Sequence, residues 1–130
     1  MNVQPWHDSE EQIVGGLRKL CTEGGSGNFM IVSSGDVYVQ FAGRHGDTRI
    51  ECQTVGNAYL PTKRKLTMDK IHELQRLGFV LDEEPANFSK TFELSDEQKA
   101  RELATLALTI LEYVYGCRRD SKLDIQLTLE

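Results

Sequence analysis

Apolar and polar residues alternate on both sides of one polar turn in residues 36–60. The turn, 43–47, carries two glycines, and the runs before and after it have the two-residue period of a β-strand. Positions on the predicted apolar face are Val37, Val39, Phe41, Ile50, Cys52 and Thr54. The pattern predicts an antiparallel hairpin with one apolar face, which the rest of the chain must cover.

The remaining segments supply elements for that cover. Helical periodicity is found in 9–23, 67–77 and 95–115, and strand patterns in 28–33, 79–82 and 88–94. The predicted order is helix, three strands, helix, two strands, helix, and then an extra strand at the C-terminus. The predicted fold class is therefore α/β (α+β), with helices packed on a twisted antiparallel sheet. With no repeat or linker, residues 1–130 form one domain, with a core of 9–116 and a tail of 117–130.

Polar residues at the predicted helix starts indicate N-caps. Asp8 precedes Glu11, and Ser95 precedes Gln98, each with the spacing of a capping box, while Thr67 can cap the middle helix. Two glycines, Gly15 and Gly16, lie inside the first helix, where close packing would explain them.

The third helix is apolar around most of its circumference. A helix on one sheet needs only about a 100° apolar arc, so this helix should be covered on a second side. We expect a homodimer on this basis. Leu106 and Tyr113, seven residues apart toward the edge of the apolar surface, are the predicted interface residues, whereas Ala104 and Ala107 lie on the core stripe.

The tail alternates strictly between apolar and polar residues over 122–129. Its apolar positions are Leu123, Ile125, Leu127 and Leu129. This pattern predicts a strand that pairs with a sheet edge, either in its own chain or in a partner's, because four exposed apolar residues would favour aggregation. If that edge also binds a client, the tail acts as a resident substitute for the client.

Composition and charge exclude several classes of protein. The net charge of −5 argues against nucleic acid as a partner, and no apolar run approaches the ~20 residues that span a bilayer. The polar start lacks the features of a signal peptide, so we expect a cytoplasmic protein without a membrane partner. Three widely spaced cysteines without a CxxC pair are expected to be free thiols.

The sequence shows little that would support catalysis. Its histidines, His7, His45 and His72, have no second ligand at helical spacing, so we expect no metal. The glycine-rich segment 24–27 leads into a strand rather than a helix, which argues against a phosphate site. No nucleotide, hydrolase or dinucleotide motif is present. We therefore expect no cofactor and no enzymatic activity.

Several short motifs, taken in order, suggest a family. They are Tyr38-Val39-Gln40-Phe41, Glu51, Asn57, Tyr59-Leu60, Leu74, Leu77-Gly78-Phe79, Asn87-Phe88 and a helix over 103–115 closing on Gly116. Together they resemble the type III secretion chaperone-like superfamily, and more narrowly the bacterial TY-Chap domains grouped with YbjN. The resemblance covers about 9–116 and leaves out the terminal strand; Phe79 and Phe88 stand where that pattern has tryptophan.

The resemblance implies a non-catalytic peptide- or protein-binding module that holds an extended client segment, and it implies dimers. A dedicated regulatory or immunity-type protein that masks one partner is the alternative, and a small enzyme is the third. Tyr38 and Gln40, on the mixed face of the hairpin, are candidate client contacts, although Tyr38 could be an ordinary cross-strand aromatic. Glu51, Asn57 and Tyr59 follow from the resemblance. Asn57 could instead fix a turn, and Glu51 could pair with a neighbouring strand.

Overall fold

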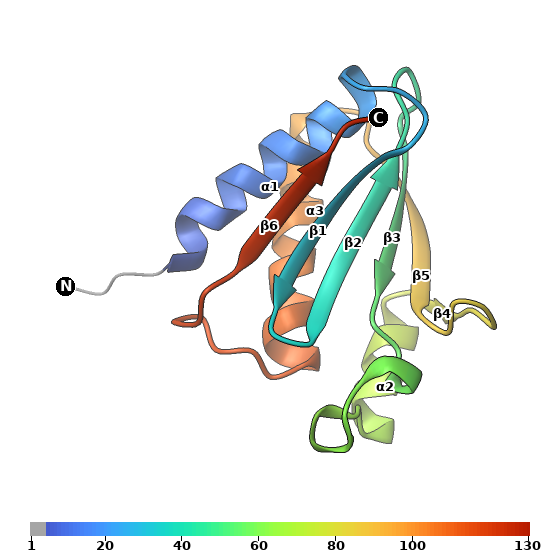
Figure 1. Ribbon diagram of the computed structural model, residues 1–130, viewed down its shortest axis with the longest axis vertical. Coiled ribbons are helices and arrows are strands. Elements are labelled where there is room, and N and C mark those ends of the chain that lie inside the picture. The colour runs from blue at the N-terminus through green and yellow to red at the C-terminus, as the bar shows by residue number, and fades with distance from the viewer. Residues whose placement is uncertain (1–4) are drawn as a thin grey trace.

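Six strands form one antiparallel sheet in the order β4-β5-β3-β2-β1-β6 (Figure 1). The computed structural model describes residues 5–130. The elements are α1 Pro5–Thr22, β1 Asn28–Ser34, β2 Val37–Gly43, β3 Arg49–Thr54, α2 Met68–Arg76, β4 Val80–Leu81, β5 Phe88–Glu93, α3 Glu97–Thr109 and β6 Asp124–Thr128. Short 3₁₀ turns occupy Asn57–Tyr59 and Thr62–Arg64, and a π-helical turn, Ile110–Val114, extends α3. The fold class and element order predicted from the sequence are confirmed.

The helices α1 and α3 cover one face of the sheet and leave the other face open (Figure 1). The strand alternation decides which residues face the helices. In β1 and β2 every second residue is buried and the residues between are half-buried. Because opposite residues of antiparallel strands share a face, the buried rows of neighbouring strands line up under the helices.

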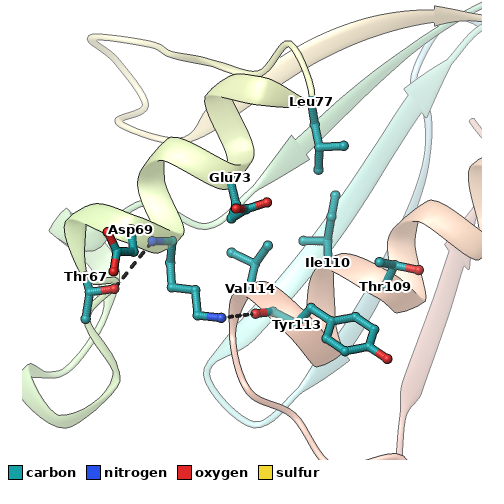
Figure 2. A pocket seen from close by; sticks show the side chains of 9 residues that line it. Thr67, Asp69, Glu73, Leu77, Thr109, Ile110, Tyr113 and Val114 are labelled. Atoms are coloured by element: carbon teal, nitrogen blue, oxygen red, sulfur yellow. Dashed lines mark hydrogen bonds between the residues drawn. The ribbon is translucent and has the colours of Figure 1, made fainter.

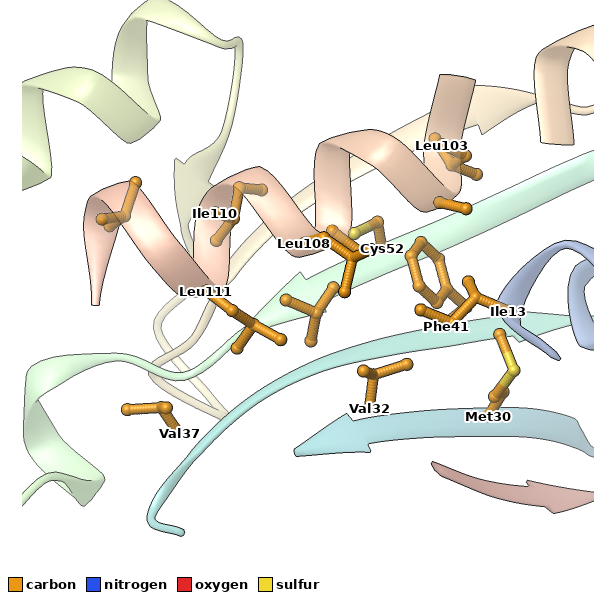
Figure 3. Close-up of a cluster of buried hydrophobic side chains, with 14 of the residues drawn as sticks. Ile13, Met30, Val32, Val37, Phe41, Cys52, Leu103, Leu108, Ile110 and Leu111 are labelled. Atoms are coloured by element: carbon orange, nitrogen blue, oxygen red, sulfur yellow. The ribbon is translucent and has the colours of Figure 1, made fainter. Parts of the chain in front are cut away.

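The core lies between the sheet and the two long helices (Figure 3). Met30, Val32 and Phe41 rise from the sheet toward Ile13 of α1 and Leu111 of the last turn of α3, and each is at most 1% exposed. The small residues Ala100, Ala104 and Ala107 of α3 are also buried. The second cover predicted for the third helix is therefore found within the chain, because α1 packs along α3.

Polar contacts reinforce the packing of α1 against α3. Thr105 donates a hydrogen bond to the Glu10 carboxylate at 2.7 Å, and Arg101 pairs with Glu11 at 2.5 Å. Of the two glycines inside α1, only Gly16 has a packing reason, because a Cβ there would collide with the Met30 sulfur. A Cβ on Gly15 would meet no atom within 4 Å.

Two helix starts differ from the predictions. α1 begins at Pro5, so Asp8 lies within its first turn and does not cap it. The N-cap of α3 is Asp96, whose carboxylate accepts from the Lys99 amide at 2.9 Å, and not Ser95. The cap of α3 was misplaced by one residue because two polar residues adjoin at its start, whereas α1 begins about one turn earlier than predicted. The prediction of Thr67 as the cap of α2 is confirmed, since its hydroxyl accepts from the Lys70 amide.

The tail forms β6, and it pairs in cis with β1 at the edge of the sheet. Ile125 lies opposite Val32 and Leu127 opposite Met30, so the apolar row of β6 joins the core face. The indole of Trp6 at the start of α1 is buried and donates to the Ser121 carbonyl at 3.0 Å, just before β6. None of the helices in the described part is long and apolar enough to cross a bilayer.

Candidate functional site

Exposed apolar side chains gather around α2. Within residues 5–130 the large hydrophobic side chains that are exposed are Tyr59, Met68, Leu77, Val80, Leu81 and Tyr113. All of them belong to α2, to the turn before it, to β4 after it, or to the last turn of α3. Scattered exposed hydrophobics need no explanation, but a concentration at one end of a small domain marks a candidate binding surface.

A groove of about 590 Å³ runs between α2 and the last turn of α3 (Figure 2). Its apolar lining consists of Leu77, Ile110, Tyr113 and Val114. Polar residues on its walls are Thr67, Asp69, Lys70, Glu73 and Thr109. Leu77 is 37% exposed and Tyr113 is 65% exposed, so both can offer apolar surface to a ligand without unfolding. A cleft with an apolar lining and a few polar groups is the usual form of a ligand site.

Side-chain contacts of Asn57, Leu74 and Lys70 hold α2 beside the end of α3. The Asn57 side chain donates to the Leu66 carbonyl at 3.1 Å and accepts from the Leu66 amide at 2.7 Å. Leu74 is fully buried and anchors α2 to the core. The Lys70 ammonium crosses the groove and donates to the Tyr113 carbonyl at 2.6 Å.

The π-helical turn explains why the Tyr113 carbonyl is available to Lys70. The amides of Tyr115 and Cys117 donate to the carbonyls of Ile110 and Leu111, and the Gly116 amide donates to that of Glu112. The Tyr113 carbonyl therefore lies at the helix end, where a side chain can satisfy it. π-Turns are common at functional sites, and this one places the Tyr113 side chain at the mouth of the groove.

The predicted contact residues Tyr38, Gln40 and Glu51 lie on the open face of the sheet, away from the groove. β2 and β3 are interior strands, so these residues can meet a client through their side chains only, and as client contacts they stay a prediction. The Tyr38 hydroxyl accepts from the side-chain nitrogen of Asn87 at 3.0 Å. Gln40 lies opposite Gln53, whose amide donates to Glu51 at 2.8 Å.

Asn57 and Tyr59 lie in the first 3₁₀ turn. Asn57 makes the turn-fixing contacts described above, which gives it a structural role. The Tyr59 hydroxyl accepts from the Ala86 amide at 3.0 Å, while more than half of the side chain is exposed. Of the predicted contact residues, Tyr38 and Tyr59 therefore both bond to the segment 86–87. Glu51 makes no hydrogen bond to that segment.

Buried polar groups under this end of the sheet were missed by the sequence analysis. Asn87 is 4% exposed, and its side-chain oxygen accepts from the Gly56 backbone amide at 3.1 Å. The Thr54 hydroxyl donates to the Tyr115 hydroxyl at 2.8 Å, and Tyr115 donates in turn to the Val55 carbonyl at 2.5 Å. Burial raises the pKa of Tyr115. These contacts tie β3, the β4–β5 loop and the end of α3 into one unit that supports the groove.

The two predicted dimer residues face different surroundings. Leu106 is half-buried and borders a shallow hollow beside Phe92, and Tyr113 stands at the groove beside α2. A dimer was expected because the wide apolar surface of α3 needs a second cover. Within the chain, α1 supplies that cover beside the sheet. The two residues stay a prediction as dimer contacts.

Two kinds of side chain that often carry chemistry, metal ligands and thiols, have ordinary surroundings in the described residues. Within 5–130, no group of three His, Cys, Asp or Glu side chains lies close enough to hold a metal ion. Cys21, Cys52 and Cys117 are free thiols, as expected. Burial raises the pKa of the Cys52 thiol far above its usual range, so it stays protonated and behaves as a small apolar side chain.

Comparison with known protein families identifies the chain's family. The sequence model of a family described as "T3SS (YopN, CesT) and YbjN peptide-binding chaperone 3", TY-Chap3, matches residues 3–128. The match extends past the range of the resemblance seen in the sequence and includes β6. Searches of curated proteins and of solved structures gave no match.

Proposed function

The chain belongs to the TY-Chap3 family of peptide-binding chaperones, and from this premise we propose that it binds a protein client through the groove between α2 and α3. The observation that carries the proposal is the concentration of exposed apolar side chains around that groove. The client contributes an extended segment with at least one large apolar side chain, which lies between Leu77 and Tyr113.

The open face of the sheet offers the client a second, weaker surface. Tyr38, Gln40 and Glu51 present polar and aromatic groups there, but their side chains already bond to neighbours or lie in a flat row. We propose that they contact flanking parts of the client and contribute less affinity than the groove. Tyr59 lies between the two surfaces and can contact either part.

Peptide selection from a random displayed library, followed by affinity measurement, tests the proposal without knowledge of the natural client. Leu77→Asp and Tyr113→Asp each place a charge where an apolar side chain binds. Burying a Leu-sized side chain stabilises by roughly 1.5–3 kcal/mol, so each change should weaken binding by about tenfold or more.

Val80→Asp is the matched control, because Val80 is as exposed as Tyr113 but does not line the groove. It should leave the affinity unchanged. If the selected peptides bind the groove variants normally but lose affinity for Gln40→Ala and Tyr38→Ala, the client lies on the open face and the groove proposal fails.

We also propose that the protein forms a homodimer and is cytoplasmic. Three free thiols fit a reducing compartment. Light scattering should give a mass near twice 14.7 kDa, and a monomer at all accessible concentrations would contradict the dimer. Leu106→Asp should lower the mass if α3 forms the interface.

A further inference from the structure

Among residues 5–130, the outer edge of β6 is an unpaired strand edge. β6 is the last strand in the sheet order, and no strand of residues 5–130 pairs with its outer side. Natural proteins usually protect such edges with proline, an inward-pointing charge or a bulge. β6 has none of these: its register with β1 is continuous over five residues, and its inward residues are Ile125 and Leu127.

One backbone hydrogen bond next to β6 shows which of its amides point outward. The Gly27 amide donates to the Glu130 carbonyl at 3.0 Å, and this pair continues the β1–β6 register. In an antiparallel ladder, hydrogen-bonded pairs recur at every second residue. The even-numbered residues of β6 therefore bond to β1. The amides and carbonyls of Ile125 and Leu127 point away from the sheet and are open to another strand.

The sequence around β6 is self-complementary about Gln126. Residues 122–130 read Lys-Leu-Asp-Ile-Gln-Leu-Thr-Leu-Glu, so charge, apolar and polar positions mirror one another. When two copies pair antiparallel with Gln126 opposite Gln126, Ile125 faces Leu127 of the second copy, and Lys122 faces Glu130. Both members of the Ile125–Leu127 pair are outward-bonding residues, so this register also satisfies the hydrogen-bonding rule.

We propose that β6 pairs with β6 of a second copy of this chain across a two-fold axis at Gln126, which joins the two sheets into one. The inference rests on the homodimer proposed above and assigns it an interface. Opposite residues share a face, so the partner's apolar row continues that of β6. A C2 contact requires such a self-complementary patch. The Lys122 and Glu130 side chains, both exposed, then form an ion pair at each end.

A second feature of this edge supports an apolar partner surface there. A hollow of about 380 Å³ lies between α1 and β6 and is lined by Gln12, Gly15, Lys19, Met30, Ile125 and Leu127. Inward side chains of an added strand would project into it. Ile125 and Leu127 are only half-buried in the single chain, and the added strand would bury them further.

Charge variants at the axis test the register. Gln126 is exposed on the open face, so Gln126→Lys and Gln126→Glu should leave the fold intact but place like charges opposite each other. Each alone should weaken the dimer by roughly fivefold at low salt. An equimolar mixture should form a heterodimer at least as stable as the wild type. Gln53→Lys, on the same face of interior strand β3, is the control and should not change the mass.

A cross-linking variant gives an independent result. At a non-hydrogen-bonded antiparallel pair the Cα atoms lie about 4.5 Å apart, within disulfide range. Gln126→Cys should therefore form a covalent dimer under mild oxidation. Asp124→Cys should not, because Asp124 faces Thr128 of the second copy.

The outcomes separate this inference from the proposed homodimer. A dimer that Leu106→Asp dissociates and Gln126→Lys leaves unchanged overturns the β6 interface but keeps the homodimer. A protein that is monomeric by sedimentation at about 100 μM overturns both. Selected peptides that bind a monomer and lose affinity for Gln126→Lys would show that the edge takes a client strand instead.

Discussion

Replacement of Asn28 by alanine should loosen the end of α1 and the end of β6 where both meet the start of β1. Asn28 is 1% exposed, and its side chain makes four hydrogen bonds to backbone groups. Its amide donates to the carbonyls of Leu20 and Glu23 at 2.9 and 2.7 Å. Its carbonyl oxygen accepts from the amides of Gly25 and Glu130 at 3.1 and 2.9 Å. One side chain thus fixes the end of α1, the following loop and the end of β6.

The expected loss of stability depends on what the four backbone groups bond to after Asn28 is removed. A net contribution of about 1 kcal/mol per hydrogen bond, with part of the chain end able to reach water, gives an expected loss of about 2–4 kcal/mol in the free energy of unfolding. Asn28→Asp is a sharper variant, because it keeps the acceptor oxygen and replaces the nitrogen that donates both hydrogen bonds with a second oxygen. It should cost at least as much, since a buried carboxylate then faces two carbonyl oxygens.

Urea unfolding followed by circular dichroism measures the loss, with Gln75→Ala as the control because it removes an exposed amide of α2. Hydrogen exchange gives the local readout. Amides of β6 that bond to β1 should be protected in the wild type and should exchange faster in Asn28→Ala, more so than amides of β2 and β3. A free energy of unfolding within about 0.5 kcal/mol of the wild type would refute the reasoning, because that is the range of ordinary surface changes.

Two further predictions concern the core and α1. The raised pKa of Tyr115 means that the folded protein keeps this proton after the unfolded chain loses it at about pH 10. Stability should therefore fall as the pH rises above about 10, less steeply in Tyr115→Phe, and equal slopes in the two proteins would contradict the assignment. Gly15→Ala should raise the free energy of unfolding by up to about 1 kcal/mol, because its Cβ meets no atom within 4 Å. Gly16→Val should lower it by collision with Met30, and thermal melts that rank the two variants in the opposite order would contradict this packing.

The alternation of apolar residues determined most of the fold from the sequence. A two-residue period specifies a strand face by itself, so the inward residues of β2, β3 and β6 were placed correctly without a structure. The glycine at 78 and the glycine at 116 also ended their helices as predicted, since both adopt positive φ. Helix caps were less certain, because several polar residues near a helix start compete within one turn, as Ser95 and Asp96 do.

The candidate site depended on contacts between segments that are distant in the sequence. Leu77 and Tyr113 are ordinary members of two amphipathic patterns, and only the docking of α2 beside the π-turn of α3 makes them two walls of one groove. The same is true of Asn28 and Asn87, whose roles depend on backbone groups of other segments.

The sequence determined that residues 122–129 form a strand, and it contained the self-complementary order about Gln126. It could not determine where that strand pairs, because period-two burial is satisfied equally by an edge in its own sheet or in another chain. Tertiary structure decided this: β6 pairs with β1 of its own chain. The Trp6 indole donates to the Ser121 carbonyl just before β6, and the side-chain oxygen of Asn28 accepts from the Glu130 amide just after it. The inner side of the strand is thereby satisfied, and its outer side is left open to a partner.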